Sequence, residues 1–382
     1  MKIISIGPAF PLRGGIANFN LALSREFAKC GHNTEIISFS FQYPRFLFPG
    51  KTQFEDGAVP ADIKIKSLIS SINPISWYRT ARYIRNFDPN LVVIHYWMPF
   101  MAISLGRILR IIKKREQIRA IAITHNIIPH EKHAGWKFLT RYFLRSCDGF
   151  ITMSSTVTDD LATFQPNAIS ACIPHPIYNI FGERVSRQSA AEFLKLPATM
   201  NYLLFFGLIR RYKGLELLLK ALPYILRQIK DIKLIIAGEF YSDKEEYFAL
   251  INELHIREHI HIMDRFIPSE EVKYYFSLAD LVVQPYLSAT QSGITQIAYH
   301  FEVPMVVTDV GGLAELVPDS KAGYVVPVDY QQVARAVIDF FEFNRSGQFR
   351  DGIKEEKKKY TWANMVMGIL ELSDKVGQKR KE

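Results

Sequence analysis

A cluster of cationic side chains follows a strand-length apolar run near the middle of the sequence. Residues 202–206 are apolar, Gly207 interrupts them, and Arg210, Arg211 and Lys213 come next. The residues that follow repeat apolar side chains at the spacing of an amphipathic helix. Unpaired N–H groups and the dipole at a helix N-terminus favour a bound anion. The segment therefore predicts an anion site, with a solvated basic turn as the alternative.

A pair of adjacent glycines marks a second candidate site near the N-terminus. Gly14 and Gly15 lie between an apolar run at residues 2–6 and an apolar repeat that predicts a helix near 15–30. Glycines let a backbone approach a ligand closely and leave N–H groups available at the helix start. The loop lacks the G-x-G-x-x-G spacing of dinucleotide-binding proteins, which argues against a dehydrogenase. A plain tight turn is the alternative.

Two histidines lie at the ends of predicted strands. His125 follows the run 120–124, and His95 ends the run 91–95. The carboxyl ends of strands carry the ligand sites of α/β sheets, and histidine exchanges protons near neutral pH. We take His125 as the catalytic candidate and His95 as a weaker candidate for contact with an acceptor substrate. For His125, the alternative is a loop histidine that is hydrogen-bonded to the backbone. Three further histidines are interpreted as ordinary loop residues: His130, His133 and His175.

Two successive α/β units are predicted to position these residues. Strands of the first are expected near 2–6, 34–39, 91–95, 120–124 and 149–153, with helices near 15–30, 74–86, 100–115, 136–146 and 155–163. Strands of the second are expected near 202–206, 233–237, 260–262, 281–283, 304–308 and 324–326, with helices near 214–229, 243–255, 269–278, 292–301 and 330–343. Several strands are continuous apolar runs, as in parallel sheets covered by helices on both faces. The predicted fold class is therefore α/β with two Rossmann-like domains, at residues 1–178 and 179–360, joined by a linker around 173–176 and 182–191.

Length and composition fit a soluble two-domain protein. The chain has 382 residues, of which 48% are apolar and 22% charged. Its apolar runs are shorter than the roughly 18–20 residues that span a bilayer, and its first seven residues are too short for a signal peptide. Cys30, Cys147 and Cys172 form neither a disulfide framework nor a metal-binding spacing. We therefore expect a cytoplasmic location.

The positive charge is confined to the first half of the chain. Residues 1–180 contain 21 lysines and arginines against 11 aspartates and glutamates, and the remainder contains 26 against 27. Basic residues mix with aromatic ones near 77–85 and 136–145 and with isoleucines near 105–119, a pattern that fits helices on an anionic membrane surface. The alternative is that their apolar residues pack on the sheet and their cations are solvated, and we favour it for the helix expected at 100–115. The absence of a recognised motif argues against a nucleic-acid partner.

Several motifs in order resemble those of the family 4 glycosyltransferases. They are the double glycine, the turn Phe206-Gly207-Leu-Ile-Arg210-Arg-Tyr-Lys213-Gly214, and Asp309-Val-Gly311-Gly312-Leu-Ala-Glu315. Gly238-Glu239, Asp264–Ile267 and Thr361-Trp362 extend the resemblance over nearly the whole chain. The resemblance implies a GT-B fold, in which two Rossmann-like domains face each other across a cleft. It also implies that the C-terminal helix at 361–382 crosses back to the first domain.

The resemblance also implies which residues act. Members transfer a sugar from a nucleotide diphosphate to an acceptor, mostly with retention, and cations stabilise the departing diphosphate. His125, Lys213 and Arg210 are the implied catalytic residues. The implied donor-binding residues are Gly14, Gly15, Gly207, Glu239, Phe266, Gln291, Ser292, Gly293, Gln296 and Glu315. The chain has no D-x-D, the metal-binding device of the GT-A fold, so we expect no metal and no cofactor.

The chain departs from the family pattern at two places. Leu208 stands where the family has arginine, so Arg210 or Arg211 must substitute. The family's spaced pair of glutamates is also missing, because the chain has no glutamate between Glu271 and Glu302. Neutral amides and hydroxyls in this region can bond sugar and ribose hydroxyls, but less strongly than carboxylates. The identity of the donor stays open.

The sequence therefore predicts a glycosyltransferase that uses a nucleotide-sugar donor and a glycan or lipid-linked acceptor. The expected setting is the synthesis of cell-envelope polysaccharide or lipopolysaccharide, with peripheral binding to the inner face of the membrane. Two alternatives remain, a sugar-nucleotide epimerase of the GT-B fold and an inactive relative that binds nucleotide sugars. The missing glutamates count against the epimerase, and the presence of His125, Lys213 and Glu315 favours activity.

Overall fold

The chain divides into two compact units, which are described separately. The first unit joins Met1–Pro176 to Thr361–Glu382, and the second is Ile177–Tyr360. The structure is a computed structural model that describes residues 1–44, 53–55, 59–113, 117–128, 135–178, 180–241, 244–289 and 292–380. The boundary at Pro176 lies close to residue 178, where the sequence suggests it.

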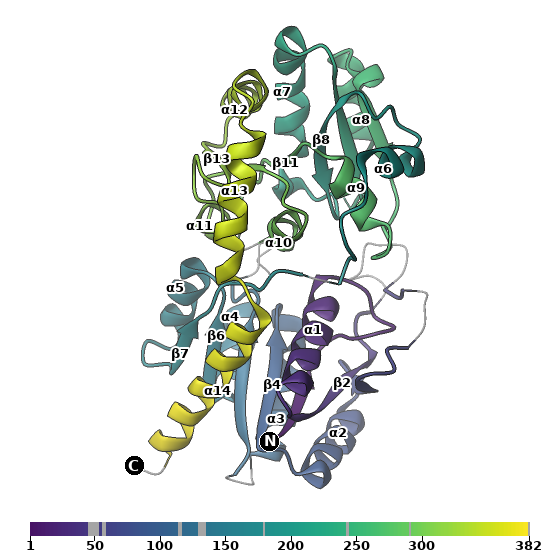
Figure 1. The fold of residues 1–382 in the computed structure, drawn as a ribbon. Helices are drawn as coiled ribbons and strands as arrows, with labels where there is room; N and C mark the ends of the chain where they lie inside the picture. Colours follow the sequence, from purple (N-terminus) through teal and green to yellow (C-terminus); the bar gives the residue numbers. More distant parts are fainter. Residues whose placement is uncertain are drawn as a thin grey trace. The chain divides into compact units, whose positions relative to one another are not determined.

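A parallel sheet forms the centre of the first unit (Figure 1). Its described residues form seven strands in the order β3-β2-β1-β4-β5-β6-β7. The strands are β1 (Lys2–Ile6), β2 (Asn33–Phe41), β3 (Lys64–Ser70), β4 (Leu91–Tyr96), β5 (Arg119–Thr124), β6 (Gly149–Thr152) and β7 (Ser170–Cys172). The order reverses direction between β1 and β4, and such a switch point is where α/β sheets bind ligands.

Helices connect most of these strands, as parallel pairing requires, and the last helix of the chain also packs on this sheet. They are α1 (Gly15–Lys29), α2 (Pro74–Phe87), the 3₁₀ turn η2 (Pro99–Met101), α3 (Ala102–Ile112), α4 (Trp136–Leu144), α5 (Ser155–Phe164) and α14 (Trp362–Lys379). Side-chain alternation then divides the strand residues between the two faces of the sheet. Ile4 and Ile6 of β1 belong to the core that includes Leu105 of α3, whereas Ser5 is bonded to Asn20 of α1.

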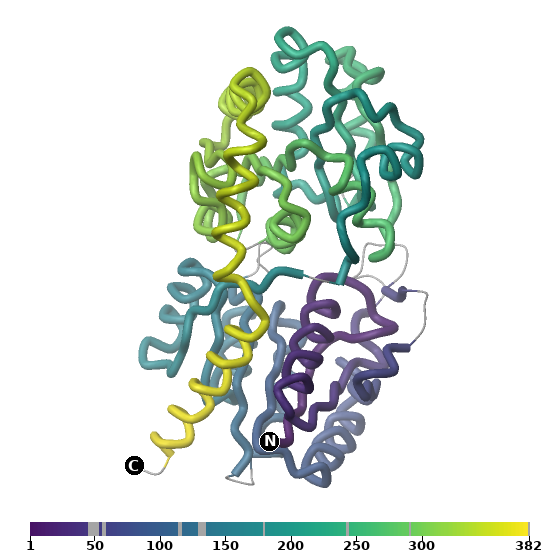
Figure 2. Tube along the Cα trace, viewed as in Figure 1, coloured from purple at the N-terminus to yellow at the C-terminus, as the bar shows by residue number. Residues whose placement is uncertain are grey.

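The last helix, α14, belongs to the first unit, as the sequence predicts. It lies along α1 and contacts β5, β6 and β7, and Figure 2 shows its yellow trace beside the purple one of α1. Helix α14 lies very close to Ile173 at Gly368, where an added Cβ would be 2.2 Å from Cδ1 of that isoleucine. Thr361 caps its first turn by accepting a hydrogen bond from the backbone N–H of Asn364.

The second unit has the same architecture. Its described residues form a six-stranded parallel sheet in the order β10-β9-β8-β11-β12-β13. The strands are β8 (Asn201–Phe206), β9 (Ile232–Ala237), β10 (Ile260–Met263), β11 (Leu281–Gln284), β12 (Met305–Thr308) and β13 (Gly323–Val326). The helices are α6 (Arg187–Leu194), η3 (Arg211–Lys213), α7 (Leu215–Gln228), α8 (Lys244–Glu253), η4 (Arg257–His259), α9 (Val272–Leu278), α10 (Gly293–His300), α11 (Gly312–Leu316), α12 (Tyr330–Glu342), α13 (Ser346–Glu356) and η5 (Lys357–Lys359).

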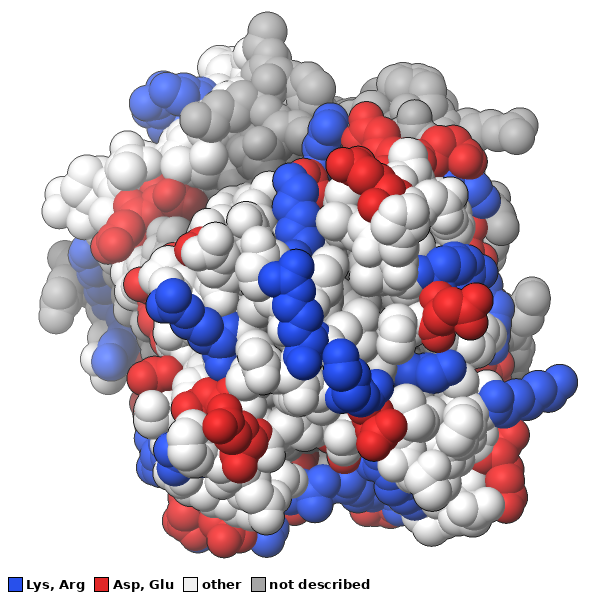
Figure 3. Space-filling model, turned by 90° about the horizontal axis from the view of Figure 1, so that it is seen from above, with Lys and Arg blue, Asp and Glu red and all other residues white. Residues whose placement is uncertain are grey.

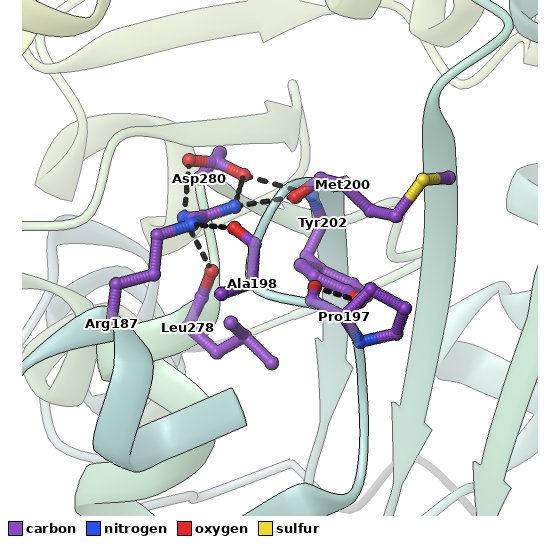
Figure 4. Close-up of polar contacts among 7 residues, drawn as sticks. All are labelled: Arg187, Pro197, Ala198, Met200, Tyr202, Leu278 and Asp280. Atoms are coloured by element: carbon purple, nitrogen blue, oxygen red, sulfur yellow. Dashed lines mark hydrogen bonds and ion pairs between the residues drawn. The ribbon is translucent and has the colours of Figure 1, made fainter. Parts of the chain in front are cut away.

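The prediction of a linker at 182–191 is wrong for residues 187–191, which belong to helix α6, whereas residues 182–186 lie in no helix or strand. Arg187 of this helix donates hydrogen bonds to the carbonyl oxygens of Ala198, Met200 and Leu278 and forms a two-pronged ion pair with Asp280 (Figure 4). Asp280 also accepts a hydrogen bond of 2.8 Å from the backbone N–H of Tyr202 at the start of β8. One guanidinium therefore ties α6 to the starts of β8 and β11.

Opposite charges are interspersed over much of the face shown in Figure 3. Ion pairs of the second unit include Lys220 with Glu216 on α7, and Lys358 with Glu355. Exposed pairs of this kind contribute little stability each. The near-neutral balance of the second half of the chain is thus distributed as local pairs.

Candidate functional site

The first unit brings two histidines together at the carboxyl ends of β4 and β5. These strands pair in parallel, with His95 opposite Ile123, so that His125 follows directly after the neighbouring strand. Nδ1 of His95 lies 2.9 Å from Nε2 of His125, and the two rings stack with centroids 5.2 Å apart. His95 is fully buried and His125 is 7% exposed. His95, expected as a weaker contact for an acceptor, instead lies inside the unit as a partner of His125.

Burial keeps both imidazoles neutral near pH 7. It lowers the pKa of His95 to about 3. Burial first, and then the neighbouring His95 and His175, lower the pKa of His125 well below its ordinary value. His175 lies in the loop after β7, as expected, but it is buried, and this burial lowers its pKa to about 4. The ring of Phe19 meets all three imidazoles edge to face. His130 and His133 lie outside the described residues.

The double glycine opens α1 on the same unit. Gly14 is the N-cap residue with a φ of 120°, a backbone conformation that favours glycine, and Gly15 is the first helical residue. Among the described residues, an added Cβ at Gly14 would meet nothing within 4 Å. The backbone angle therefore requires the glycine, and no described side chain prevents the close approach of a ligand to the start of α1.

The cationic turn of the second unit follows β8. Lys213 is the last residue of η3 and is 8% exposed. Burial, and then the nearby charge of Arg210, lower the pKa of its amine to about 7. Its Nζ lies 5.7 Å from the ring centroid of Tyr286. A buried amine of this kind is stabilised as a cation when an anion binds beside it.

Three glycines let the backbone close around this lysine. An added Cβ at Gly207 would lie 3.1 Å from Nζ of Lys213, and one at Gly214 would lie 1.9 Å from the carbonyl oxygen of Pro285. An added Cβ at Gly238 would lie 2.1 Å from the carbonyl oxygen of Gly207. All three have φ between 66° and 149°. No other residue fits these positions without displacing backbone or lysine.

The two arginines of the turn point to different partners. Arg211 forms an ion pair with Glu246 of α8, with N and O 3.2 Å apart, and its side chain is 78% exposed. Arg210 stacks over Tyr241 at 5.1 Å and is close enough to lower the pKa of Lys213. Arg210 is therefore the one that adds positive charge next to Lys213.

The start of α10 carries neutral polar groups where the resembling family has acids. Ser292 caps the helix by accepting a hydrogen bond from the N–H of Ile294, and its hydroxyl donates to Oε1 of Gln284 at 2.6 Å. Gly293 is the first helical residue. Gln296 is fully buried, and both its amide nitrogen and its amide oxygen lack a hydrogen-bond partner among the described residues. Gln291, also predicted for donor binding, lies outside the described residues.

The remaining predicted residues lie after neighbouring strands of the same sheet. Glu239 follows β9 and is 4% exposed, Phe266 follows β10 and is half-buried, and Glu315 is an exposed residue of α11 after β12. Together with the turn after β8 and the start of α10 after β11, they line the carboxyl edge of five adjacent strands. This edge is where parallel α/β sheets bind ligands.

Sequence reasoning missed two contributors to this edge. Gln284 ends β11 and bonds both Ser292 and Thr295, and Tyr286 lies beside Lys213. Gln284 is a polar residue at the end of an apolar strand, and that signal could have revealed it. The described residues contain no group of three or more His, Cys, Asp or Glu side chains arranged to hold a metal ion.

Comparison with known proteins agrees with this geometry. Residues 13–178 match the model of "Glycosyltransferase Family 4", and residues 200–342 match that of "Glycosyl transferases group 1". The chain belongs to the family 4 glycosyltransferases. The first model covers the double glycine and both histidines, and the second covers the cationic turn and the start of α10.

Relatives of this family 4 member are distant. It is 29% identical to D-inositol 3-phosphate glycosyltransferase 1 of Catenulispora acidiphila, over 48% of this chain and 46% of that protein. It is 22% identical to the putative teichuronic acid biosynthesis glycosyltransferase TuaC of Bacillus subtilis, over 67% of this chain and 62% of that one. The aligned regions thus span about half to two thirds of these curated relatives.

A solved structure shows the fold of this family 4 member. Anabaena Alr3699/HepE in complex with UDP and glucose superposes with a TM-score of 0.75 at 13% identity, covering 97% of this chain and 98% of that one. The fold is therefore GT-B, as the sequence predicts. No helix in the described part of the chain has the length and hydrophobicity needed to span a bilayer.

Proposed function

We propose that this family 4 glycosyltransferase moves a sugar from a nucleotide-diphosphate donor to a glycan or lipid-linked acceptor. The observation that carries the proposal is the buried amine of Lys213, packed against Gly207 and close to Arg210. Burying an amine without an anionic partner is costly, so the arrangement favours a site that is completed by a bound anion. A diphosphate supplies that charge.

The chemistry follows from the charge that develops when the sugar leaves the donor. The bond between the anomeric carbon and the diphosphate oxygen breaks, and negative charge grows on the diphosphate. Lys213 and Arg210 stabilise that charge more strongly as it develops, which lowers the barrier. The N–H groups at the start of α10, beside Gly293, add to this stabilisation. Side chains and backbone N–H groups would thus stabilise the departing diphosphate without a metal ion.

His125 is proposed to act on the sugar. Because its pKa is lowered by burial, the imidazole is neutral and can exchange hydrogen bonds with sugar hydroxyls without carrying a charge. His125→Ala should lower kcat far more than donor affinity, because the residue would act in the transition state and not on the diphosphate. Retention of the anomeric configuration is part of the proposal and rests on the family resemblance.

The test of this function is sugar transfer from a panel of nucleotide sugars, with product configuration read by NMR. UDP-sugars come first, because the HepE structure contains UDP and glucose. The expected result is a product that retains its configuration, and loss of its formation in His125→Ala and Lys213→Ala but not in Lys220→Ala. Lys220 is an exposed lysine on α7, paired with Glu216, and serves as the matched control. An inverted product would refute retention, and full turnover by His125→Ala would refute its role.

The cellular role is proposed as envelope polysaccharide or lipopolysaccharide assembly on the inner face of the membrane. Four apolar side chains of the first unit are strongly exposed near helix starts: Ile75 (62%) and Tyr78 (51%) of α2, Ile103 (46%) of α3 and Phe138 (72%) of α4. Helices of a parallel α/β unit start at the carboxyl ends of the strands, the edge that also carries His125. The TuaC relative is named for teichuronic acid biosynthesis, which supports this setting.

Cations accompany these apolar groups. Arg107 of α3 donates a hydrogen bond to the hydroxyl of Tyr78 on α2, which joins the two helix surfaces. Arg141 and Arg145, on and just after α4, are exposed. Apolar side chains that insert at the headgroup level and cations that face anionic lipids are the two components of interfacial binding. We propose an anionic bilayer as the occupant of this surface.

Vesicle sedimentation tests the membrane proposal. Binding to vesicles rich in anionic lipid should fall as salt is raised, because the Debye length shortens to about 8 Å at physiological ionic strength. Phe138→Ala and the double reversal Arg141→Glu with Arg145→Glu should each reduce binding. The matched control is a double reversal of exposed cations in the second unit, Arg227→Glu with Lys230→Glu. Equal binding to neutral vesicles, or none to either, would mean that the charge serves only solubility.

A further inference from the structure

Behind His125 lies a chain of hydrogen bonds that reaches α1. His125 Nε2 meets His95 Nδ1 at 2.9 Å, and His95 Nε2 meets the hydroxyl of Ser5 at 3.3 Å. That hydroxyl donates to Oδ1 of Asn20 at 2.5 Å, and Nδ2 of Asn20 donates to the carbonyl oxygen of Pro8 at 3.0 Å. Ser5, Asn20 and His95 are fully buried. We call these three residues and His125 the histidine relay.

The hydrogen bonds of the relay determine which nitrogen of each imidazole carries the hydrogen. The amide of Asn20 is oriented by its donation to Pro8, so its oxygen faces Ser5 and the serine hydroxyl must donate. The serine oxygen is then an acceptor, which requires the hydrogen of His95 on Nε2. A neutral imidazole carries only one such hydrogen, so Nδ1 of His95 accepts. His125 must therefore donate from Nε2.

Packing holds the rings in the orientation that these bonds need. An added Cβ at Gly7 would lie 2.8 Å from Cδ2 of His95 and 3.2 Å from Nδ2 of Asn20. Phe19 meets the rings of His95 and His125 edge to face, with centroids 5.6 Å and 5.2 Å away. The imidazole of His95 is thus confined by backbone on one side and an aromatic ring on another, and neither ring can rotate freely.

We propose that His95, held by Ser5 and Asn20, is a positioning residue that fixes the tautomer and the ring plane of His125. His125 then carries its proton on Nε2, and its Nδ1 is able only to accept a hydrogen bond. This inference rests on the proposed function, in which His125 acts on the donor sugar, and it adds that His125 accepts from a sugar hydroxyl and does not donate to it. The same logic orients histidines in other catalytic sites, where a wrong tautomer removes most of the activity.

Nitrogen NMR of the full-length protein tests the tautomers directly. With ¹⁵N-labelled histidine, His95 and His125 should each show a protonated Nε2. His175 is an internal reference of the opposite kind, because its Nδ1 lies 2.7 Å from the carbonyl oxygen of Pro176 and must carry the hydrogen. Signals are assigned by their loss in single-histidine variants. A protonated Nδ1 on His125 near neutral pH would overturn the proposal.

Two pairs of variants test the consequence for the reaction. Ser5→Ala removes the acceptor of His95 and should lower kcat by up to about a hundredfold, with donor affinity unchanged and a second tautomer of His125 visible. Ser24→Ala is the matched control, because the buried hydroxyl of Ser24 on α1 has no hydrogen-bond partner among the described residues. His95→Asn retains an acceptor near the place of Nδ1 and should keep more activity than His95→Leu.

The outcomes separate the relay from the proposed function. Unchanged kcat and tautomer in Ser5→Ala, or equal kcat in His95→Asn and His95→Leu, would overturn the relay and leave the transferase activity standing. If His95→Leu fails to fold, Ser5→Ala and the spectrum of the unmodified protein still decide. The predicted tautomers in a protein that transfers no sugar would support the relay and overturn the proposed function alone.

Discussion

Lys213 shows how the burial of one amine can favour the binding of an anion. Its amine is buried beside Tyr286 and near Arg210, and both the burial and the neighbouring positive charge disfavour the cation. The pKa is lowered to about 7, which means that the free protein carries the charge only part of the time at neutral pH. A bound diphosphate would reverse this by favouring the cation.

Diphosphate binding should therefore take up a proton. Binding raises the pKa of Lys213, so affinity is highest below pH 7, where the amine is already charged. It falls above pH 7, by up to about tenfold per pH unit, until the pKa of the complex is passed. Calorimetry from pH 6 to pH 9 measures this slope. Lys213→Arg should abolish it, because arginine keeps its charge throughout; affinity that rises with pH would contradict this account.

Replacement of Gln296 should affect donor binding without lowering the thermal stability of the protein. Both amide atoms are buried without partners among the described residues, so Gln296→Leu should leave the Tm of the free protein unchanged or higher. The same change should weaken donor binding by about 1 kcal/mol, if the amide bonds the donor. Gln284→Leu is the contrast, since its amide bonds Ser292 and Thr295 and its loss should lower the Tm. Equal donor affinity in Gln296→Leu would remove this residue from the site.

At the scale of single residues, the sequence indicates which residues are candidates for the site better than it indicates which side chains they contact. The cations of the turn, the double glycine and His125 stand out because each interrupts an apolar pattern. The pairing of His95 with His125 could not be predicted, because it depends on the register between β4 and β5. The amide of Gln296 lacks hydrogen-bond partners among the described residues because of how the side chains pack, and residue spacing in the sequence does not reveal this.

Among the elements, the turn between β8 and α7 is the most constrained. Gly214 has a φ of 66° and faces the carbonyl oxygen of Pro285, so Gly214→Ala should cost about 1–3 kcal/mol in strain alone. Urea unfolding measures this loss, and nucleotide affinity should fall with it because the turn holds Lys213. Gly347→Ala is the control, since its site on α13 is open and helical. Similar stability of the two variants would show that the turn is not strained by a side chain.

Helix α6 is held by one guanidinium. Arg187→Ala leaves three carbonyl groups and Asp280 without this donor and should lower the free energy of unfolding by about 2–3 kcal/mol. Arg187→Lys should recover only part of this, because an ammonium cannot form the two-pronged pair. Denaturant midpoints measure both, with exposed Arg227→Ala as control. Full recovery by lysine would show that charge alone matters.

The elements that the sequence predicts are those with strong apolar patterns. Strands β4, β9 and β12 each contain a continuous apolar run, at 91–94, 234–237 and 305–307, and α7 repeats leucines at helical spacing. Strands β3 and β7 were missed because both lie at sheet edges, where one is interrupted by lysines and the other has only three residues. Helices α6, α11 and α13 were missed because they are polar or short.

On the scale of the whole molecule, both units are built on a parallel sheet, but the two halves of the chain differ in net charge. The first half of the chain holds the entire positive excess, and its apolar side chains are exposed near helix starts. The second half is balanced and contains the buried Lys213. We therefore propose lipid binding for the first unit and diphosphate binding for the second, and under this proposal variants in one unit should leave the other function intact.

Calorimetric titration with nucleoside diphosphates in EDTA tests the central claim most directly, because it needs no knowledge of the acceptor. The account predicts that UDP, GDP or ADP binds without metal. It further predicts that Lys213→Ala weakens that binding by about 1.5–3 kcal/mol, whereas Lys220→Ala binds like the unmodified protein. Equal affinity in Lys213→Ala, or binding that appears only when Mn²⁺ is added, would contradict it.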